Sequence, residues 1–130
     1  MCIIGNVYKI PMNEEDGITV KDDYDFRNKY IIVLGVDGKN NILGVVVTNS
    51  QINLLHHEFD FQYEIKQEKY EEIFEKDSYV DCSKLYSVYE GRIKYKKKGK
   101  INIDDYDAIV NKVRKHPDIT KRTLKKFNLL

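Results

Sequence analysis

The sequence predicts a mainly β protein (α+β) in which a small β-barrel is followed by C-terminal helices. Two observations lead to this prediction. Short apolar or alternating runs separated by turn residues fill positions 1–95, which favours a barrel or a sandwich over a parallel α/β fold. Apolar side chains then recur at helical spacing within a basic tail, 96–130. The length of 130 residues suits a single domain, 1–130, with one core.

The first predicted strand covers residues 3–10 and is rich in β formers. Pro11 is expected to end it, because proline has no N–H to donate to a neighbouring strand. Residues 12–26 are polar and predict a long loop with a short extended piece at 18–20. Long loops in compact domains are uncommon and often functional. We therefore expect the loop 13–26 to cover a site.

A β-hairpin is the best supported element. Residues 30–36 form a continuous apolar run with the length and the β-branched content of a strand buried on both faces. Asp37-Gly38 is a hairpin signal, and 42–48 is the returning strand. The elements predicted after it are a polar connection (49–58), a half-buried strand (59–65), a short helix (66–76), two short strands (79–82 and 85–88) and a strand or turn (89–95).

Two helices are predicted in the tail. Residues 104–115 have acidic side chains in the first turn and basic ones in the last, and both suit the helix dipole. Pro117 ends this helix. A second helix, 120–127, begins at a capping side chain, either Thr120 or Asp118.

Charge is distributed unevenly along the chain. Residues 1–90 hold nine basic and 17 acidic residues, a balance of −8, whereas residues 91–130 hold 13 basic and four acidic residues, a balance of +9. Such asymmetry indicates a polyanion partner at the basic end or an acidic partner protein. A solvated tail that keeps the domain in solution is the alternative.

The cysteine and histidine content predicts neither a disulfide framework nor a metal site. Cys2 and Cys82 are not in a C-x-x-C pair and are expected to be reduced thiols in a cytoplasmic protein. His56 and His57 are adjacent with no cysteine near them, so no metal or other cofactor is predicted. No apolar run approaches the roughly 20 residues of a membrane span. The first residues also lack the layout of a signal peptide.

Several segments, taken in order, resemble the PemK/MazF family of toxin ribonucleases. The segments are Gly5-Asn6-Val7-Tyr8-Lys9-Ile10, Arg27-Asn28-Lys29-Tyr30-Ile31-Ile32-Val33-Leu34, Val45-Val46-Val47-Thr48-Asn49-Ser50, 79–88, Arg92-Ile93 and 98–106. They resemble the family's opening strand, its Arg-Pro segment before a buried strand, a strand that ends in a Thr-Ser pair, and its closing stretch before a capped helix. This chain departs from the family at Asn28, where the family has proline, and at Asn49, which separates Thr48 from Ser50.

The resemblance implies an SH3-like barrel that acts as a homodimeric, metal-independent endoribonuclease of a toxin–antitoxin system. Family members cut single-stranded RNA at short sequences, and an antitoxin protein blocks their site. The ribose 2′-hydroxyl attacks the adjacent phosphate, which leaves a cyclic phosphate and a free 5′-hydroxyl. Such a reaction needs a base, an acid and cationic help for the phosphorane.

Arg27 is the first candidate for the cationic role, because a guanidinium stays charged and presents a planar fork to phosphate. Thr48 and Ser50 lie where a buried strand ends, and either hydroxyl is a candidate to contact the phosphate or the 2′-hydroxyl. Turn formation is the competing explanation for that pair. His56 and His57 are possible acid–base groups, since histidine titrates near neutral pH.

Other polar residues complete the candidates. Asp23, Asp25 and Asp81 are possible bases. The candidates for RNA binding are Lys29, Lys84, Lys96, Lys97 and Lys98, with Arg114, Lys115, Lys121, Arg122, Lys125 and Lys126 in the tail. Two rivals to the nuclease stay open. The same barrel is alternatively a non-catalytic module that binds nucleic acid or a partner protein, or an inactive oligomeric scaffold.

Overall fold

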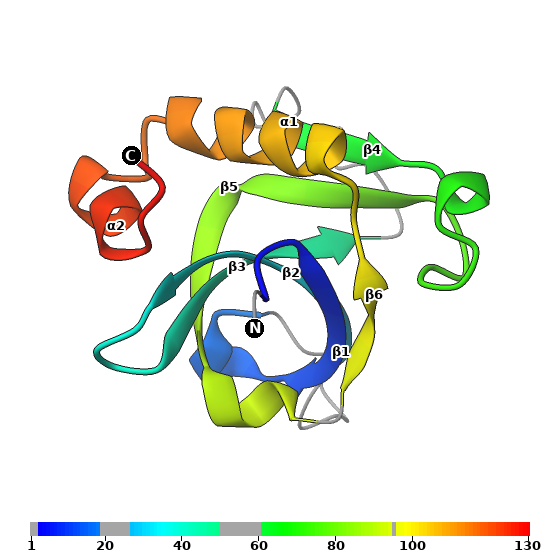
Figure 1. The fold of residues 1–130 in the computed structure, drawn as a ribbon, viewed down its shortest axis with the longest axis horizontal. Helices are drawn as coiled ribbons and strands as arrows, with labels where there is room; N and C mark the ends of the chain where they lie inside the picture. The colour runs from blue at the N-terminus through cyan, green and yellow to red at the C-terminus, as the bar shows by residue number, and fades with distance from the viewer. Residues whose placement is uncertain (1–2, 19–26, 50–60, 95) are drawn as a thin grey trace.

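A computed structural model describes residues 3–18, 27–49, 61–94 and 96–130. Its main element is one antiparallel sheet with the strand order β4-β5-β3-β2-β1-β6, which curls around an interior, with two helices at one side (Figure 1). The strands are β1 (Asn6–Met12), β2 (Arg27–Asp37), β3 (Ile42–Asn49), β4 (Gln62–Ile65), β5 (Ser78–Tyr89) and β6 (Lys97–Lys100). The helices are α1 (Ile103–Lys115) and α2 (Lys121–Lys126). The prediction of a mainly β fold followed by C-terminal helices is confirmed.

The predicted hairpin is confirmed as β2 and β3. Ile31 pairs with Val47 and Asp37 with Ile42, and the tight turn between them places Asn41 at a φ of 52°. Asparagine tolerates this left-handed conformation better than most residues. Successive residues of β2 face opposite sides of the sheet, and both sides are buried. This explains why the run from residue 30 to residue 36 is apolar without a break.

The prediction that Pro11 ends the first strand is wrong. β1 continues to Met12, and Pro11 pairs with Asn28 of β2. On its other side β1 pairs with the short β6 only from Asn6 to Tyr8. The Pro11 carbonyl accepts a hydrogen bond from Arg92, so this edge of the residue faces away from β2. Proline is tolerated there because no neighbouring strand requires its missing N–H.

β5 is one long strand rather than the two short strands predicted. Its pairing with β3 shifts register between Val45 and Val47, which pair with Tyr86 and Asp81 respectively. The extra residues of β5 at this shift form a bulge, which bends a strand without ending it. The bend that the sequence suggested near residue 84 is therefore accommodated inside β5.

Four other local predictions are met in part. The expected helix over residues 66–76 is only a 3₁₀ turn, Gln67–Lys69, because Asp77 accepts the Gln67 N–H and folds the segment back on itself. The expected strand or turn at 89–95 is confirmed as a turn, Glu90–Ile93, of the 3₁₀ type. Of the half-buried strand predicted over 59–65, residues 62–65 form β4, while residues 50–60 lie outside the described part. The loop 12–26 contains a 3₁₀ turn, Glu14–Asp16, and its residues 19–26 are likewise not described.

The sheet extends beyond residue 95, where the sequence analysis placed the end of the barrel. β6 pairs with β1 and so belongs to the sheet. Both tail helices form as predicted. Asn102 caps α1 by accepting the N–H of Asp105, and Thr120 caps α2 by accepting the N–H of Thr123.

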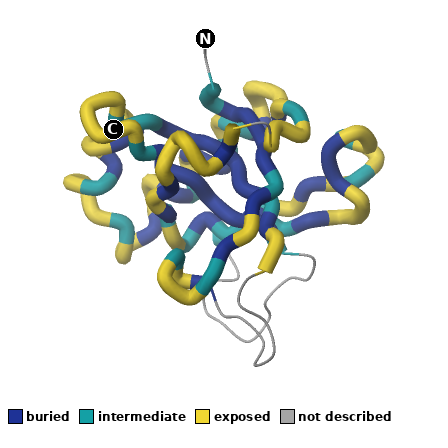
Figure 2. The backbone as a smooth tube through the Cα atoms, turned by 90° about the horizontal axis from the view of Figure 1, so that it is seen from below, coloured by how far each residue is buried: buried dark blue, intermediate teal, exposed yellow. Residues whose placement is uncertain are grey.

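Two apolar clusters lie on the two faces of the curled sheet, and burial is concentrated in the strands while the turns are exposed (Figure 2). The first cluster joins the sheet to the helices and includes Ile32, Leu34, Ile109 and Phe127. The second fills the interior of the curl. In the described part of the chain, no helix is both long enough and apolar enough to span a membrane.

Cys82 belongs to the first cluster, and its side chain is fully buried. Burial raises the pKa of this thiol to about 12, so the reactive thiolate is absent at neutral pH. We expect that in a Cys2→Ser background a thiol reagent such as DTNB labels folded protein only as fast as the chain unfolds. Labelling rates followed through a urea titration test this. Rapid labelling without urea would contradict the expected burial.

Candidate functional site

A pocket of about 220 Å³ lies where β2 begins and β3 ends. Three of the residues that the sequence nominated, Arg27, Lys29 and Thr48, line it together. The other lining residues are Lys9, Asn28, Tyr30, Asn49, Glu75, Lys76 and Ser78. The hairpin brings Arg27, Lys29 and Thr48 together, since its antiparallel pairing sets the start of β2 beside the end of β3.

Strand alternation fixes how these side chains are presented. Arg27 and Lys29 share the face of β2 that continues into Ile31 and the interior cluster. Extending the pairing of Ile31 with Val47 by two residues sets Lys29 opposite Asn49. Thr48 has the opposite orientation and pairs with Val80 of β5.

Lys29 is the least expected feature of the pocket, because its residue is only 6% exposed. Its Nζ donates a hydrogen bond of 2.8 Å to Asn49 Oδ1, a cross-strand contact. Burial and the positive charge of Arg27 lower the pKa of Lys29 to about 8, while the Asp81 carboxylate opposes this shift. In the sequence analysis, Lys29 was assigned only a general role in RNA binding. Lys29 lies two residues before the buried Ile31, so both side chains are on the same face of β2. This alternation was the signal for burial.

The pocket is positively charged overall. Four of its described lining residues are basic and one, Glu75, is acidic. Lys9 lies 3.8 Å from the Glu75 carboxylate, and its ammonium is 5.1 Å from the centre of the Tyr30 ring. The Glu75 side chain is mostly exposed, so this ion pair neutralises little of the local charge. An anion is the ligand that this set of side chains fits.

Other predicted residues lie elsewhere. Lys84 lies over the Tyr86 ring, 4.6 Å from its centre, beside a different pocket. Lys96, Lys97 and Lys98 are exposed at the start of the edge strand β6 and do not line the Arg27 pocket. Asp81 accepts the backbone N–H of Ser83, as well as its hydroxyl hydrogen at 2.5 Å. Ser50, His56, His57, Asp23 and Asp25 lie outside the described residues.

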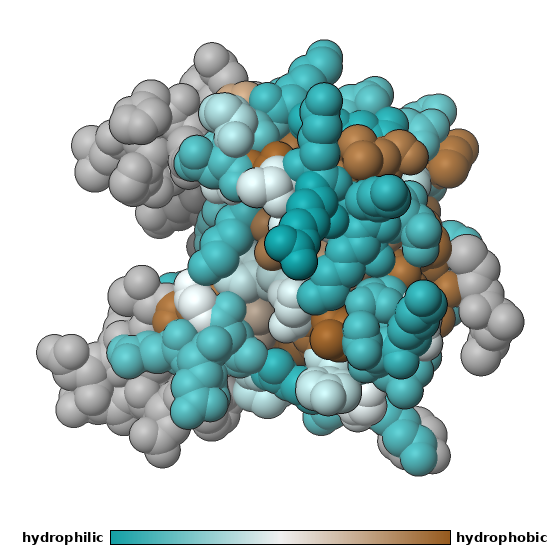
Figure 3. Space-filling model, turned by 90° about the vertical axis from the view of Figure 1, so that its left-hand side faces the viewer, coloured by the Kyte–Doolittle hydropathy of each residue, from teal (hydrophilic) through white to brown (hydrophobic). Residues whose placement is uncertain are grey.

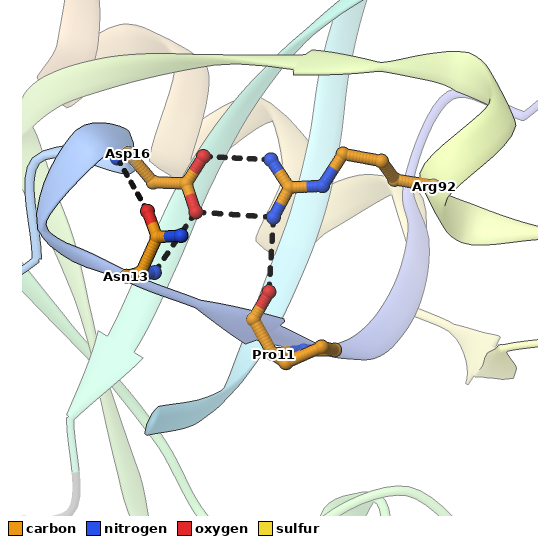
Figure 4. Close-up of polar contacts among 4 residues, drawn as sticks. All are labelled: Pro11, Asn13, Asp16 and Arg92. Carbon is orange, nitrogen blue, oxygen red and sulfur yellow. Dashed lines mark hydrogen bonds and ion pairs between the residues drawn. The ribbon is translucent and has the colours of Figure 1, made fainter. Parts of the chain in front are cut away.

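Arg92 belongs to one of the segments that resemble the PemK/MazF family. Its contacts hold a loop in place (Figure 4). Its guanidinium donates to both carboxylate oxygens of Asp16, at 2.6 and 3.0 Å, and to the carbonyl of Pro11 at 2.9 Å. Asn13 caps the turn that carries Asp16. The hydrogen bonds from Arg92 and from the backbone N–H of Asn13 outweigh desolvation and lower the pKa of Asp16. Arg92 thus fixes the first part of the 12–26 loop against the turn after β5.

Asp105 forms a second polar cluster that sequence reasoning missed. Its carboxylate accepts hydrogen bonds from the Tyr63 hydroxyl at 2.5 Å and from the Tyr70 hydroxyl, and it pairs with Lys69 at 2.9 Å. The Tyr70 hydroxyl also accepts the N–H of Asn102 at 2.9 Å. The sequence assigned Asp105 only to the helix dipole. It in fact joins the start of α1 to β4 and to the turn after β4.

No three His, Cys, Asp or Glu side chains in the described ranges gather as ligands for a metal ion. Comparison of the chain with models of known protein families finds no match. A comparison with curated protein sequences also finds none. The arrangement of the pocket is therefore the basis for assigning a function.

Proposed function

We propose that the protein is an SH3-like endoribonuclease of toxin–antitoxin type, which cuts single-stranded RNA without a metal ion. The observation that carries the proposal is that Arg27, Lys29 and Thr48 all line one basic pocket. The family resemblance of the same segments supports it. A homodimer, inhibition by an antitoxin protein and a cytoplasmic location belong to the same proposal.

The pocket provides groups that phosphoryl transfer requires. The Arg27 guanidinium binds the non-bridging phosphate oxygens, and its charge offsets the charge that develops in the phosphorane. Thr48 lines the same pocket near the end of β3, on the opposite face of the sheet from Arg27, and its hydroxyl is the group that we assign to hydrogen-bond the phosphate from that side. Because β2 and β3 are packed on both faces, they hold these groups with little freedom, which favours a fixed attack geometry.

The test is cleavage of a long single-stranded RNA by purified protein in EDTA. We expect discrete fragments ending in cyclic phosphate, and a loss of about 10²–10³-fold in rate for Arg27→Ala, as for removal of one charge-stabilising donor. Lys39→Ala, in the exposed turn at the opposite end of the hairpin, is the control and should keep full activity. Absence of cutting by folded wild-type protein would refute the nuclease for the RNA tested.

A binding module without catalysis is the second candidate, and the exposed basic tail favours it. Lys121, Arg122, Lys125 and Lys126 are exposed on α2. The side of the molecule that carries α2 is mostly hydrophilic (Figure 3). RNA binding that weakens steeply with salt, together with no cleavage, would favour this candidate.

A further inference from the structure

We propose that Lys29 is the general acid of this site and protonates the 5′-oxygen that leaves when the RNA chain is cut. This inference rests on the proposed ribonuclease function and adds to it the residue that moves the second proton. It starts from the geometry of Lys29, which is buried, lies on the same face of β2 as Arg27 and lines the same pocket.

The position of the ammonium suits a donor. An ammonium has three N–H bonds, and the hydrogen bond recorded for Nζ uses one of them, to Asn49 Oδ1. This bond holds the end of an otherwise flexible side chain against β3. Among the described residues Nζ makes no second hydrogen bond, so two N–H bonds are left for a ligand.

The charges around Lys29 come from several elements. The two that act on its ammonium are Arg27 on its own strand and Asp81 on β5. Lys9 and Glu75 also line the pocket, but they lie on the opposite face of β2, beside Tyr30. Burial and Arg27 lower the pKa of the ammonium to about 8, with Asp81 acting in the opposite direction. A general acid works best when its pKa is near the working pH. An ordinary exposed lysine, with a pKa of about 10.4, is a much poorer donor.

The chemical step balances within the RNA and the protein. The 2′-oxygen gives its proton to a base and forms a bond to phosphorus, and the bond between phosphorus and the 5′-oxygen breaks. The electron pair of that bond stays on the 5′-oxygen, which takes a proton from Lys29 Nζ. The products are a 2′,3′-cyclic phosphate, a free 5′-hydroxyl and a neutral lysine, which water then reprotonates.

A sulfur leaving group tests this role. After the wild-type cut position in a long RNA is mapped, a short oligonucleotide is made with sulfur in place of the bridging 5′-oxygen at that position. A thiolate leaves without protonation. Lys29→Met, which keeps the length and apolar stem of the side chain, should lose about 10²-fold or more on the oxygen substrate. On the sulfur substrate it should stay within a few-fold of the wild type.

Two controls separate this role from phosphate binding and from misfolding. Arg27→Ala should lose activity on both substrates, and thermal unfolding should show that Lys29→Met is folded. Should that variant not fold, the wild type alone decides: its rate should fall above pH 8 with the oxygen substrate and not with the sulfur one. Equal defects of Lys29→Met on both substrates, or equal pH profiles, would overturn the inference. Failure of the wild type to cut any RNA would overturn the proposed function as well.

Discussion

Replacing Phe127 with alanine is expected to lower the free energy of unfolding by about 3–5 kcal/mol, the range for a buried phenylalanine. Phe127 follows α2, is 1% exposed and belongs to the cluster between the sheet and the helices. Its ring and backbone lie directly on Gly35 and Gly44 of the central hairpin. A Cβ on Gly44 would lie 2.7 Å from the ring, and one on Gly35 would lie 2.1 Å from the Phe127 carbonyl oxygen.

A double-mutant cycle with Gly44→Ala gives this prediction its control. Alone, Gly44→Ala should destabilise the protein, because the new methyl group collides with the Phe127 ring and the dense core cannot move freely. Combined with Phe127→Ala, it should cost much less, since the methyl group then fills part of the cavity. Urea unfolding of the four proteins measures the coupling. Additive effects would show that Phe127 does not pack on Gly44.

Replacing Asp105 with alanine is expected to lower the free energy of unfolding by about 3 kcal/mol, as expected for several lost hydrogen bonds to a charged group. The change removes the acceptor of two tyrosine hydroxyls and the partner of Lys69. Asp105→Asn keeps the size and one acceptor oxygen, so it should cost less. Tyr63→Phe and Tyr70→Phe should each cost a fraction of the alanine effect. An Asp105→Ala protein as stable as the wild type would refute this role.

The same cluster predicts how stability depends on pH. Burial alone would raise the pKa of Asp105, but the hydrogen bonds from Tyr63, Tyr70 and Lys69 outweigh it, so the pKa is lowered. A lowered folded-state pKa stabilises the fold above the unfolded value of about 3.9. That contribution is lost as the pH falls through the folded-state pKa. Asp105→Asn should therefore lose less stability than the wild type between neutral pH and pH 3.

At alkaline pH the same cluster makes stability fall as the pH rises. Burial and the Asp105 carboxylate raise the pKa of Tyr63 to about 12, and they raise that of Tyr70 as well. A raised folded-state pKa contributes stability below the unfolded value of about 10. This contribution disappears as the pH rises through about 12. Tyrosine absorbance during an alkaline titration should show these two hydroxyls ionising only as the protein unfolds.

Local signals in the sequence determined the hairpin and the tail helices. The turn at Asp37-Gly38 and the capping side chains Asn102 and Thr120 act on neighbouring residues, so they operate wherever the segment lies. The candidate site was partly predictable for the same reason. Arg27 begins β2 and Thr48 lies near the end of β3, so the antiparallel pairing of the two strands sets both residues at one pocket.

Contacts between segments explain the elements whose bounds or type were predicted wrongly from local signals. Pro11 stays within a strand because the edge strand beside it is short, and the segment 66–76 forms a turn because Asp77 and the core hold it. β5 remains continuous because a bulge against β3 absorbs its bend. Each outcome depends on a contact outside the segment that was being predicted.

By itself, the sequence determined a mainly β chain with a central hairpin, capped C-terminal helices and a basic tail. Apolar periodicity, turn residues and helix caps depend on residues that are close in the sequence, so they can be recognised without the tertiary structure. Only the tertiary structure decided that Lys29 is buried beside Arg27 and that Asp105 is held by two tyrosines. It also placed Phe127 on two glycines of the hairpin. The physical reason is that burial, and the pKa shifts that follow from it, depend on which distant side chains exclude water from a group.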